Sequence, residues 1–201
     1  LEGMFAFALF DARTGELHLA RDRLGIKPLV YALDASGDRL AFASEIPALL
    51  ADERIGRDLD PAAAWDYFSY GYVPTPATIY RAICKLPPAH TLTFAAGRAI
   101  LNRYWQPRFE HLDDAAAVAA DALADHVDRA VADYLVADVP TGAYLSGGLD
   151  SSIVTQRAAA VFADHDPARR LGGDRLHTFS IAFDVEQHSE LQYARAAADA
   201  Y

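Results

Sequence analysis

The first half of the chain alternates short apolar runs with turn-forming residues, a pattern typical of antiparallel sheet. Residues 4–10 are almost wholly apolar, and the turn sequence 11–15 follows them. After the turn, Leu17 and Leu19 alternate with His18. This pattern predicts a hairpin whose first strand is buried.

Further strands and short helices are expected between this hairpin and residue 105. The expected elements are strands over 29–33 and 40–43, helices over 45–51 and 62–70, and a second hairpin formed by 91–94 and 99–105 about Gly97. Ser44 is expected to cap the first helix and Asp60 the second. Four prolines between residues 74 and 88 predict an irregular stretch. Antiparallel sheet is therefore expected to dominate the first half.

The hydrophobic pattern of the sequence changes after Pro107, and apolar residues recur at helical spacing from 116 to 135. One long amphipathic helix is predicted there. The elements expected after it are a strand over 142–145, a helix over 151–163, a strand over 176–183 and a helix from about 189. This alternation predicts a parallel α/β layer, in which ligands bind at the carboxyl ends of the strands.

Composition and charge narrow the class of protein. The 201 residues are 52% apolar, enough for ordinary buried cores, and the net charge of −10 disfavours nucleic acid and anionic membranes as partners. Residues 1–105 hold 11 basic and 12 acidic groups, whereas 106–201 hold 7 and 16, a step that indicates two domains. No apolar run approaches the ~20 residues of a membrane span, and no secretory leader is visible, so a cytoplasmic location is expected.

Outside the loop at residues 146–152, few side chains suggest a catalytic or metal-binding role. Cys84 is the single cysteine, which excludes an internal disulfide, and we interpret it as a small core residue rather than a nucleophile. The histidines are scattered without ligand spacing. The aspartates of the long helix are interpreted as a solvated face rather than a metal cluster.

The run from Ser146 to Ser152, Ser-Gly-Gly-Leu-Asp-Ser-Ser, lies between a predicted strand and a predicted helix. Its two glycines let the backbone approach a ligand closely. The backbone amides of the loop and of the first helical turn attract an anion. The serine hydroxyls add donors, and Asp150 offers a carboxylate for a metal ion. A glycine turn capped by serine is the plain alternative. The chain contains neither a Walker-type nor a dinucleotide-binding glycine motif.

The complete run resembles the pyrophosphate loop of ATP pyrophosphatases, which implies ATP as the ligand. The stretch 21–29, Arg-Asp-Arg-Leu-Gly-Ile-Lys-Pro-Leu, resembles the Arg-Asp-x-x-Gly-x-x-Pro-Leu signature of class II glutamine amidotransferases. In this order the two motifs resemble the glutamine-hydrolysing asparagine synthetase family. The resemblance implies the C-terminal part of an α+β N-terminal-nucleophile amidotransferase domain over 1–107. It implies the N-terminal part of an α/β parallel-sheet ATP-pyrophosphatase domain over 108–201.

The resemblance also assigns site residues. Those it implies for ATP binding are Leu145, Ser146, Gly147, Gly148, Leu149, Asp150, Ser151, Ser152 and Ile181, with Asp150 also assisting Mg²⁺. The family's nucleophilic cysteine would lie upstream of Leu1, so no catalytic residue is assigned. Arg21 and Asp22 are interpreted as an ion pair that fixes a turn. Both ends of the chain fall within regular elements, so we expect a piece of a longer protein that is inactive alone.

The implied activity is ATP-dependent synthesis of asparagine from aspartate and glutamine through a β-aspartyl adenylate, with release of AMP and pyrophosphate. Two alternatives stay open. One is an amidotransferase of the same architecture that acts on another carboxylate, as in exopolysaccharide-associated relatives, and the other is a non-catalytic relative. The implied partners are small molecules (glutamine, aspartate and ATP), with neither nucleic acid nor membrane, and a homodimer is left open.

Overall fold

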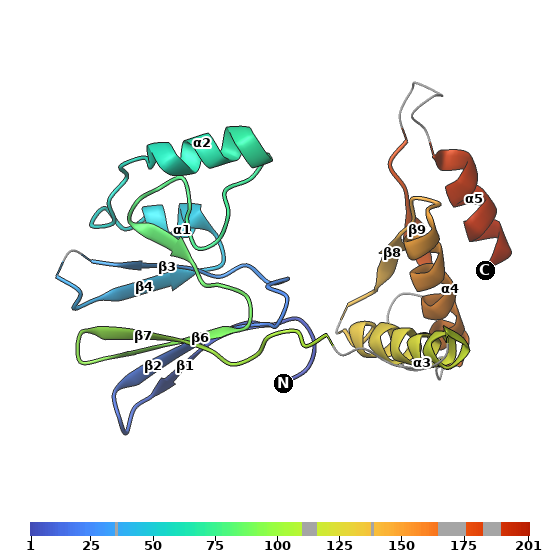
Figure 1. Ribbon diagram of the computed structural model, residues 1–201, viewed down its shortest axis with the longest axis horizontal. Coiled ribbons are helices and arrows are strands. Elements are labelled where there is room, and N and C mark those ends of the chain that lie inside the picture. The colour runs from blue at the N-terminus through green and yellow to red at the C-terminus, as the bar shows by residue number, and fades with distance from the viewer. Residues whose placement is uncertain (35, 110–115, 138, 165–175, 183–189) are drawn as a thin grey trace. The chain divides into compact units, whose positions relative to one another are not determined.

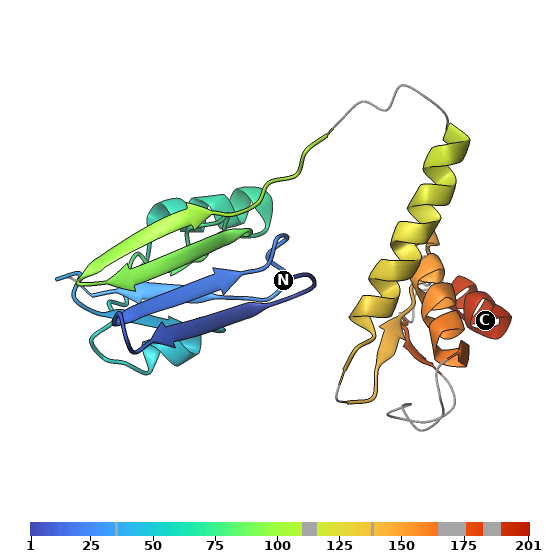
Figure 2. The ribbon, with the colours of Figure 1, turned by 90° about the horizontal axis from the view of Figure 1, so that it is seen from below.

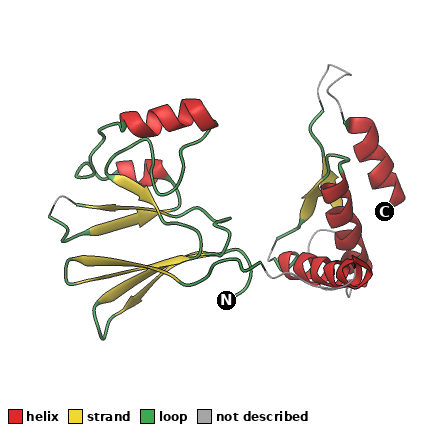
Figure 3. Cartoon of the chain, viewed as in Figure 1, coloured by secondary structure: helices red, strands yellow, loops and turns green. Residues whose placement is uncertain are grey.

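The computed structural model describes residues 1–34, 36–109, 116–137, 139–164, 176–182 and 190–201. The chain divides into two compact units, Leu1–Glu110 and His111–Tyr201. Antiparallel strands dominate the first unit, and helices dominate the second (Figure 3). The described residues thus form a mixed α/β chain.

In the first unit, the part of the chain that the structure describes forms two antiparallel sheets and two helices (Figure 1). One sheet has the strand order β1-β2-β6-β7 and consists of β1 (Ala6–Asp11), β2 (Glu16–Arg21), β6 (His90–Ala95) and β7 (Arg98–Arg103). The other has the order β4-β3-β5 and consists of β4 (Leu40–Ala43), β3 (Val30–Leu33) and β5 (Ile83–Lys85). The helices are α1 (Ile46–Leu50) and α2 (Pro61–Tyr70).

Two hydrophobic cores lie on opposite faces of the β4-β3-β5 sheet. Because side chains alternate along a strand, Tyr31 of β3 lies on one face while Val30 and Ala32 lie on the other. Tyr31 packs on a core made of Leu19 and Leu92 from the four-stranded sheet and of Leu29 and Leu86, which directly flank β3 and β5. Val30 and Ala32 pack with Ile83 and with Leu49 of α1. The first unit is therefore layered as helix, sheet and sheet.

The predicted strands of this unit are present, with one correction and one omission. The apolar run at 4–10 forms β1, but the prediction that this strand is buried is wrong: Leu9 is 57% exposed and Phe10 is 63% exposed. β1 is an edge strand, and no described strand pairs with its outer side. β5 falls within the stretch expected to be irregular. Only its pairing with β3 makes it a strand, because three residues carry too little local pattern.

The two short helices differ in how they begin. Asp60 caps α2 as predicted, since its carboxylate accepts a hydrogen bond of 3.0 Å from the Ala62 amide. The prediction that Ser44 caps α1 is wrong. Glu45 holds the N-cap position there, without a side-chain hydrogen bond.

The described residues of the second unit form three helices and a pair of parallel strands (Figure 2). Its elements are α3 (Ala116–Tyr134), β8 (Gly142–Tyr144), α4 (Leu149–Asp164), β9 (His177–Phe179) and α5 (Leu191–Ala200). The strand–helix–strand order and the parallel pairing of β8 with β9 agree with the predicted α/β pattern. α4 begins two residues before the predicted start.

The long helix α3 packs on α4. Asp128 of α3 lies 3.0 Å from the guanidinium of Arg157 on α4, so this aspartate belongs to an ion pair and not simply to a solvated face. The described residues contain no group of three or more His, Cys, Asp or Glu side chains that could hold a metal ion. A search of the same residues finds no helix with the length and apolar character needed to cross a membrane.

Candidate functional site

The glycine loop starts from a buried point between the two parallel strands. Leu145 follows β8 directly and is 1% exposed. Its amide donates to the Phe179 carbonyl at 2.9 Å, which extends the β8–β9 pairing by one residue. The Ser180 hydroxyl donates to the Leu145 carbonyl at 2.6 Å. These bonds fix the position from which the loop leaves the sheet.

Hydrogen bonds among serine hydroxyls hold the loop against the start of α4. The Ser146 and Ser151 hydroxyl oxygens lie 3.0 Å apart, and Ser151 donates to the Gly148 carbonyl at 3.1 Å. The amides of Ser146 and Gly148 each donate to one of these hydroxyls at 3.3 Å. The loop is therefore tied to the first turn of the helix through its own side chains.

Gly147 has a positive φ of 88° and lies against the first turn of α5. A Cβ at this position would stand 2.5 Å from the Ala194 amide nitrogen and 2.6 Å from the Tyr193 Cβ. Both the backbone conformation and the lack of space require glycine here. The close approach brings α5 to the loop.

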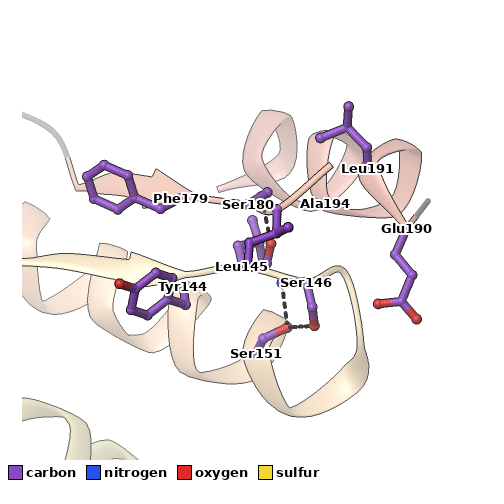
Figure 4. Close-up of a pocket in the computed structure, with 10 residues that line it drawn as sticks. Tyr144, Leu145, Ser146, Ser151, Phe179, Ser180, Glu190, Leu191 and Ala194 are labelled. Carbon is purple, nitrogen blue, oxygen red and sulfur yellow. Dashed lines mark hydrogen bonds between the residues drawn. The ribbon is translucent and has the colours of Figure 1, made fainter. Parts of the chain in front are cut away.

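A cavity of about 450 Å³ lies beside the ends of β8 and β9 (Figure 4). Four of the predicted nucleotide-binding residues line it: Leu145, Ser146, Ser151 and Ile181. The other five belong to the loop and the first turn of α4 but are not among its lining residues: Gly147, Gly148, Leu149, Asp150 and Ser152. The ligand-binding role of all nine residues stays a prediction.

Sequence reasoning missed the remaining lining residues: Tyr144, Phe179, Ser180, Glu190, Leu191 and Ala194. Tyr144, Phe179 and Ser180 stand at the ends of the parallel strands, where the rule for α/β sheets points to a ligand site. Glu190, Leu191 and Ala194 carry no comparable signal, because only the packing of α5 against Gly147 brings them to the cavity.

The cavity can bind an anion only through uncharged hydrogen-bond donors. None of its described lining residues is a Lys, Arg or His. The first amides of α4 have no carbonyl partner within the helix and carry the positive end of its dipole. Asp150 is exposed in this first turn. Since Mg²⁺ is often held by one or two carboxylates together with phosphate oxygens, this single carboxylate fits the implied Mg²⁺.

In the first unit, the signature stretch 21–29 forms a hydrogen-bonded turn at the end of β2. The Asp22 carboxylate is 1% exposed and accepts from the amides of Leu24, Ile26 and Lys27 at 3.2, 2.9 and 2.9 Å. Burial opposes ionisation of Asp22, but these backbone donors outweigh it, and the pKa of Asp22 lies below its ordinary range.

Arg21 binds three carbonyls in the same region. Its guanidinium donates to Lys27, Leu86 and Gly25 at 2.8, 2.7 and 2.7 Å. The prediction of an ion pair between Arg21 and Asp22 is wrong, because the described residues contain no salt bridge between them. Each side chain instead satisfies backbone groups of the turn.

Cys84 lies in β5 opposite Tyr31 of β3 and is partly buried. Burial raises the pKa of its thiol, although a hydrogen bond with Tyr31 acts in the opposite direction. A raised pKa disfavours the thiolate, which is the nucleophilic form. These observations agree with the prediction that Cys84 is structural.

Comparison with known families identifies both halves of the chain. Residues 1–105 match the family described as "Glutamine amidotransferase domain", and residues 122–201 match the family described as "Asparagine synthase". The chain therefore contains glutamine amidotransferase and asparagine synthase domain sequence.

Relatives that match nearly the whole of this chain are named glutamine-hydrolysing asparagine synthetases. The chain is 39% identical to "Asparagine synthetase [glutamine-hydrolyzing] 3" of Bacillus subtilis, over 98% of the chain and 30% of that relative. It is 39% identical to a putative asparagine synthetase of Mycobacterium bovis, over 100% of the chain and 30% of the relative. It is 34% identical to one of Methanocaldococcus jannaschii, over 98% and 37%. The chain belongs to the glutamine-hydrolysing asparagine synthetase family, and it spans about 30% of the length of the first relatives.

Proposed function

We propose that the protein containing these residues makes asparagine from aspartate and glutamine in an ATP-dependent ligase reaction. The family and the names of its relatives support asparagine synthesis. The proposed use of ATP rests on one observation, the cavity at the carboxyl ends of the two parallel strands. The serine-glycine loop and the start of α4 lie together at this cavity.

The chemistry proceeds in two displacements. A β-carboxylate oxygen of aspartate attacks the α-phosphorus of ATP, and the bond to pyrophosphate breaks, giving β-aspartyl adenylate. Ammonia from glutamine hydrolysis then attacks the β-carbonyl carbon, loses a proton and displaces AMP. Asparagine, AMP and pyrophosphate are the products.

Within the second unit, we assign the nucleotide to the cavity next to the glycine loop. Ile181 is exposed and supplies apolar surface for the adenine, Leu145 anchors the start of the loop, and the amides and hydroxyls of 146–152 bind the pyrophosphate end. Asp150 would hold Mg²⁺, which offsets phosphate charge when bound. This charge compensation is needed because the described lining contains no cationic side chain.

Within the first unit, we assign residues 1–107 to the C-terminal part of an N-terminal-nucleophile amidotransferase domain. For the second unit, we assign residues 108–201 to the N-terminal part of the ATP-pyrophosphatase domain. We place the whole protein in the cytoplasm. The signature turn at 21–29 has a structural role in this scheme, since Arg21 and Asp22 bind backbone groups. The nucleophile of glutamine hydrolysis is not Cys84, whose thiol is partly buried.

Product analysis of the complete gene product tests this proposal. With ATP, Mg²⁺, glutamine and aspartate, we expect AMP, pyrophosphate and asparagine in equal amounts, and none of the three without aspartate. Pyrophosphate release that needs a different carboxylate would show another acceptor. Glutamine hydrolysis without ATP turnover for any acceptor tested would contradict the nucleotide site.

A further inference from the structure

Glu190 stands at the start of α5 and lines the cavity beside the glycine loop (Figure 4). It occupies the N-cap position of the helix, yet its carboxylate makes no capping hydrogen bond. Only its backbone carbonyl serves the helix, by accepting from the amides of Tyr193 and Ala194 at 3.0 and 3.1 Å. The carboxylate is exposed and free to receive a hydrogen bond from a ligand.

Contact between α5 and the glycine loop holds Glu190 in place. Ala194 lies one helical turn after Glu190, and its amide approaches Gly147 so closely that a Cβ on Gly147 would stand 2.5 Å away. Glu190, Leu191 and Ala194 all line the cavity. The packing of helix on loop therefore sets the position of the carboxylate relative to Ser146.

The chemistry of the cavity restricts what Glu190 can bind. It is the only carboxylate among the described lining residues, which otherwise carry hydroxyl or apolar side chains. A carboxylate repels phosphate oxygens and requires a hydrogen-bond donor. In ATP, the donors are the ribose 2′- and 3′-hydroxyls and the exocyclic amine of the base, while ionised phosphates offer none.

We propose that Glu190 accepts hydrogen bonds from the ribose hydroxyls and thereby makes the site selective for ribonucleotides. The inference rests on the proposed function, in which the adenine lies against Ile181 and the phosphates lie at the loop. The ribose joins these two parts of the nucleotide, so it must lie within the same cavity. Carboxylates commonly bind ribose hydroxyls in nucleotide sites.

The test is equilibrium binding of ATP, 2′-deoxy-ATP and 3′-deoxy-ATP to the complete protein, measured at a low and at a saturating Mg²⁺ concentration. Wild type is expected to bind ATP about tenfold more tightly than at least one deoxy analogue, since a hydrogen bond to a charged group is worth this much. Glu190→Ala should weaken ATP binding about tenfold and leave binding of that analogue unchanged. Glu190→Gln keeps an acceptor oxygen, so it should lose only part of the difference in affinity between ATP and that analogue.

Asp199→Ala is the matched control, because Asp199 is another exposed acid of α5 and does not line this cavity. It should keep the wild-type ratio between ATP and the analogues. An unchanged ratio in Glu190→Ala, or equal weakening of all three nucleotides, would overturn the inference. A loss that disappears when the Mg²⁺ concentration is raised would assign Glu190 to the cation and would also overturn it. Absence of ATP binding by wild type would instead overturn the proposed function itself.

Discussion

Gly147 and Ala194 are so close that a single Cβ on Gly147 would stand 2.5 Å from the Ala194 amide nitrogen. The contact joins the glycine loop after β8 to the first turn of α5, two segments almost fifty residues apart in sequence. Residues of α5 line the cavity only because this contact exists. Nucleotide binding is therefore expected to depend on the packing of α5 as well as on the loop.

Gly147→Ala is expected to abolish measurable ATP binding in the complete protein. The added Cβ must displace the backbone of α5, and alanine is also strained at a φ of 88°. Gly56→Ala is the control, because Gly56 lies outside the candidate site, its added Cβ would meet only the Ala82 side chain at 3.5 Å, and its φ is not positive. Calorimetric binding of ATP to both variants tests the difference. Equal losses would show that the contact with α5 is not the cause.

Asp22→Ala is expected to destabilise the first unit by about 3 kcal/mol, because it leaves three partly buried amides of the signature turn without an acceptor. Asp58→Ala, at an exposed aspartate of the same unit, should change stability by less than about 0.5 kcal/mol. Denaturant unfolding of the complete protein, followed by a probe in the first unit, measures both. A near-neutral Asp22→Ala would contradict the structural role of the turn.

The lowered pKa of Asp22 predicts a loss of stability in acid. The pKa of this carboxyl is lower in the folded than in the unfolded state. Its ionised form therefore contributes its full stabilisation at pH values above the unfolded pKa of about 3.9. That contribution is lost as the pH falls through the lower folded pKa. Comparing wild type with Asp22→Asn between neutral and acid pH checks this, since the variant should show a shallower decline. Parallel declines would assign the acid sensitivity to other groups.

Cys84 is expected to react slowly with iodoacetamide at neutral pH, because burial raises the pKa of its thiol. Mass spectrometry of the peptide containing Cys84 should show little alkylation in the native protein and rapid alkylation in denaturant. Cys84→Ala should keep glutamine hydrolysis. Loss of hydrolysis in a folded alanine variant would show that Cys84 takes part in the reaction.

Local chemistry made much of the architecture predictable. Asp60 before Pro61 carries its own signal for a helix start, and the capping hydrogen bond is present. The glycine-rich run before α4 likewise indicates a ligand loop without reference to other segments. Interactions over long sequence separations were not predictable. β5 exists because it pairs with β3, and β1 is exposed because it lies at a sheet edge.

The sequence by itself determined the order of the elements other than β5, the two motifs and the family they indicate, because each of these depends on neighbouring residues. Only the tertiary structure decided which side chains share the cavity. Leu145 is far from Ile181 and Glu190 in the chain, and they meet because β8 pairs with β9 and α5 packs against Gly147. The structure also decided that Arg21 and Asp22 bind backbone groups and not each other, since carbonyls and amides of the turn lie within reach of both.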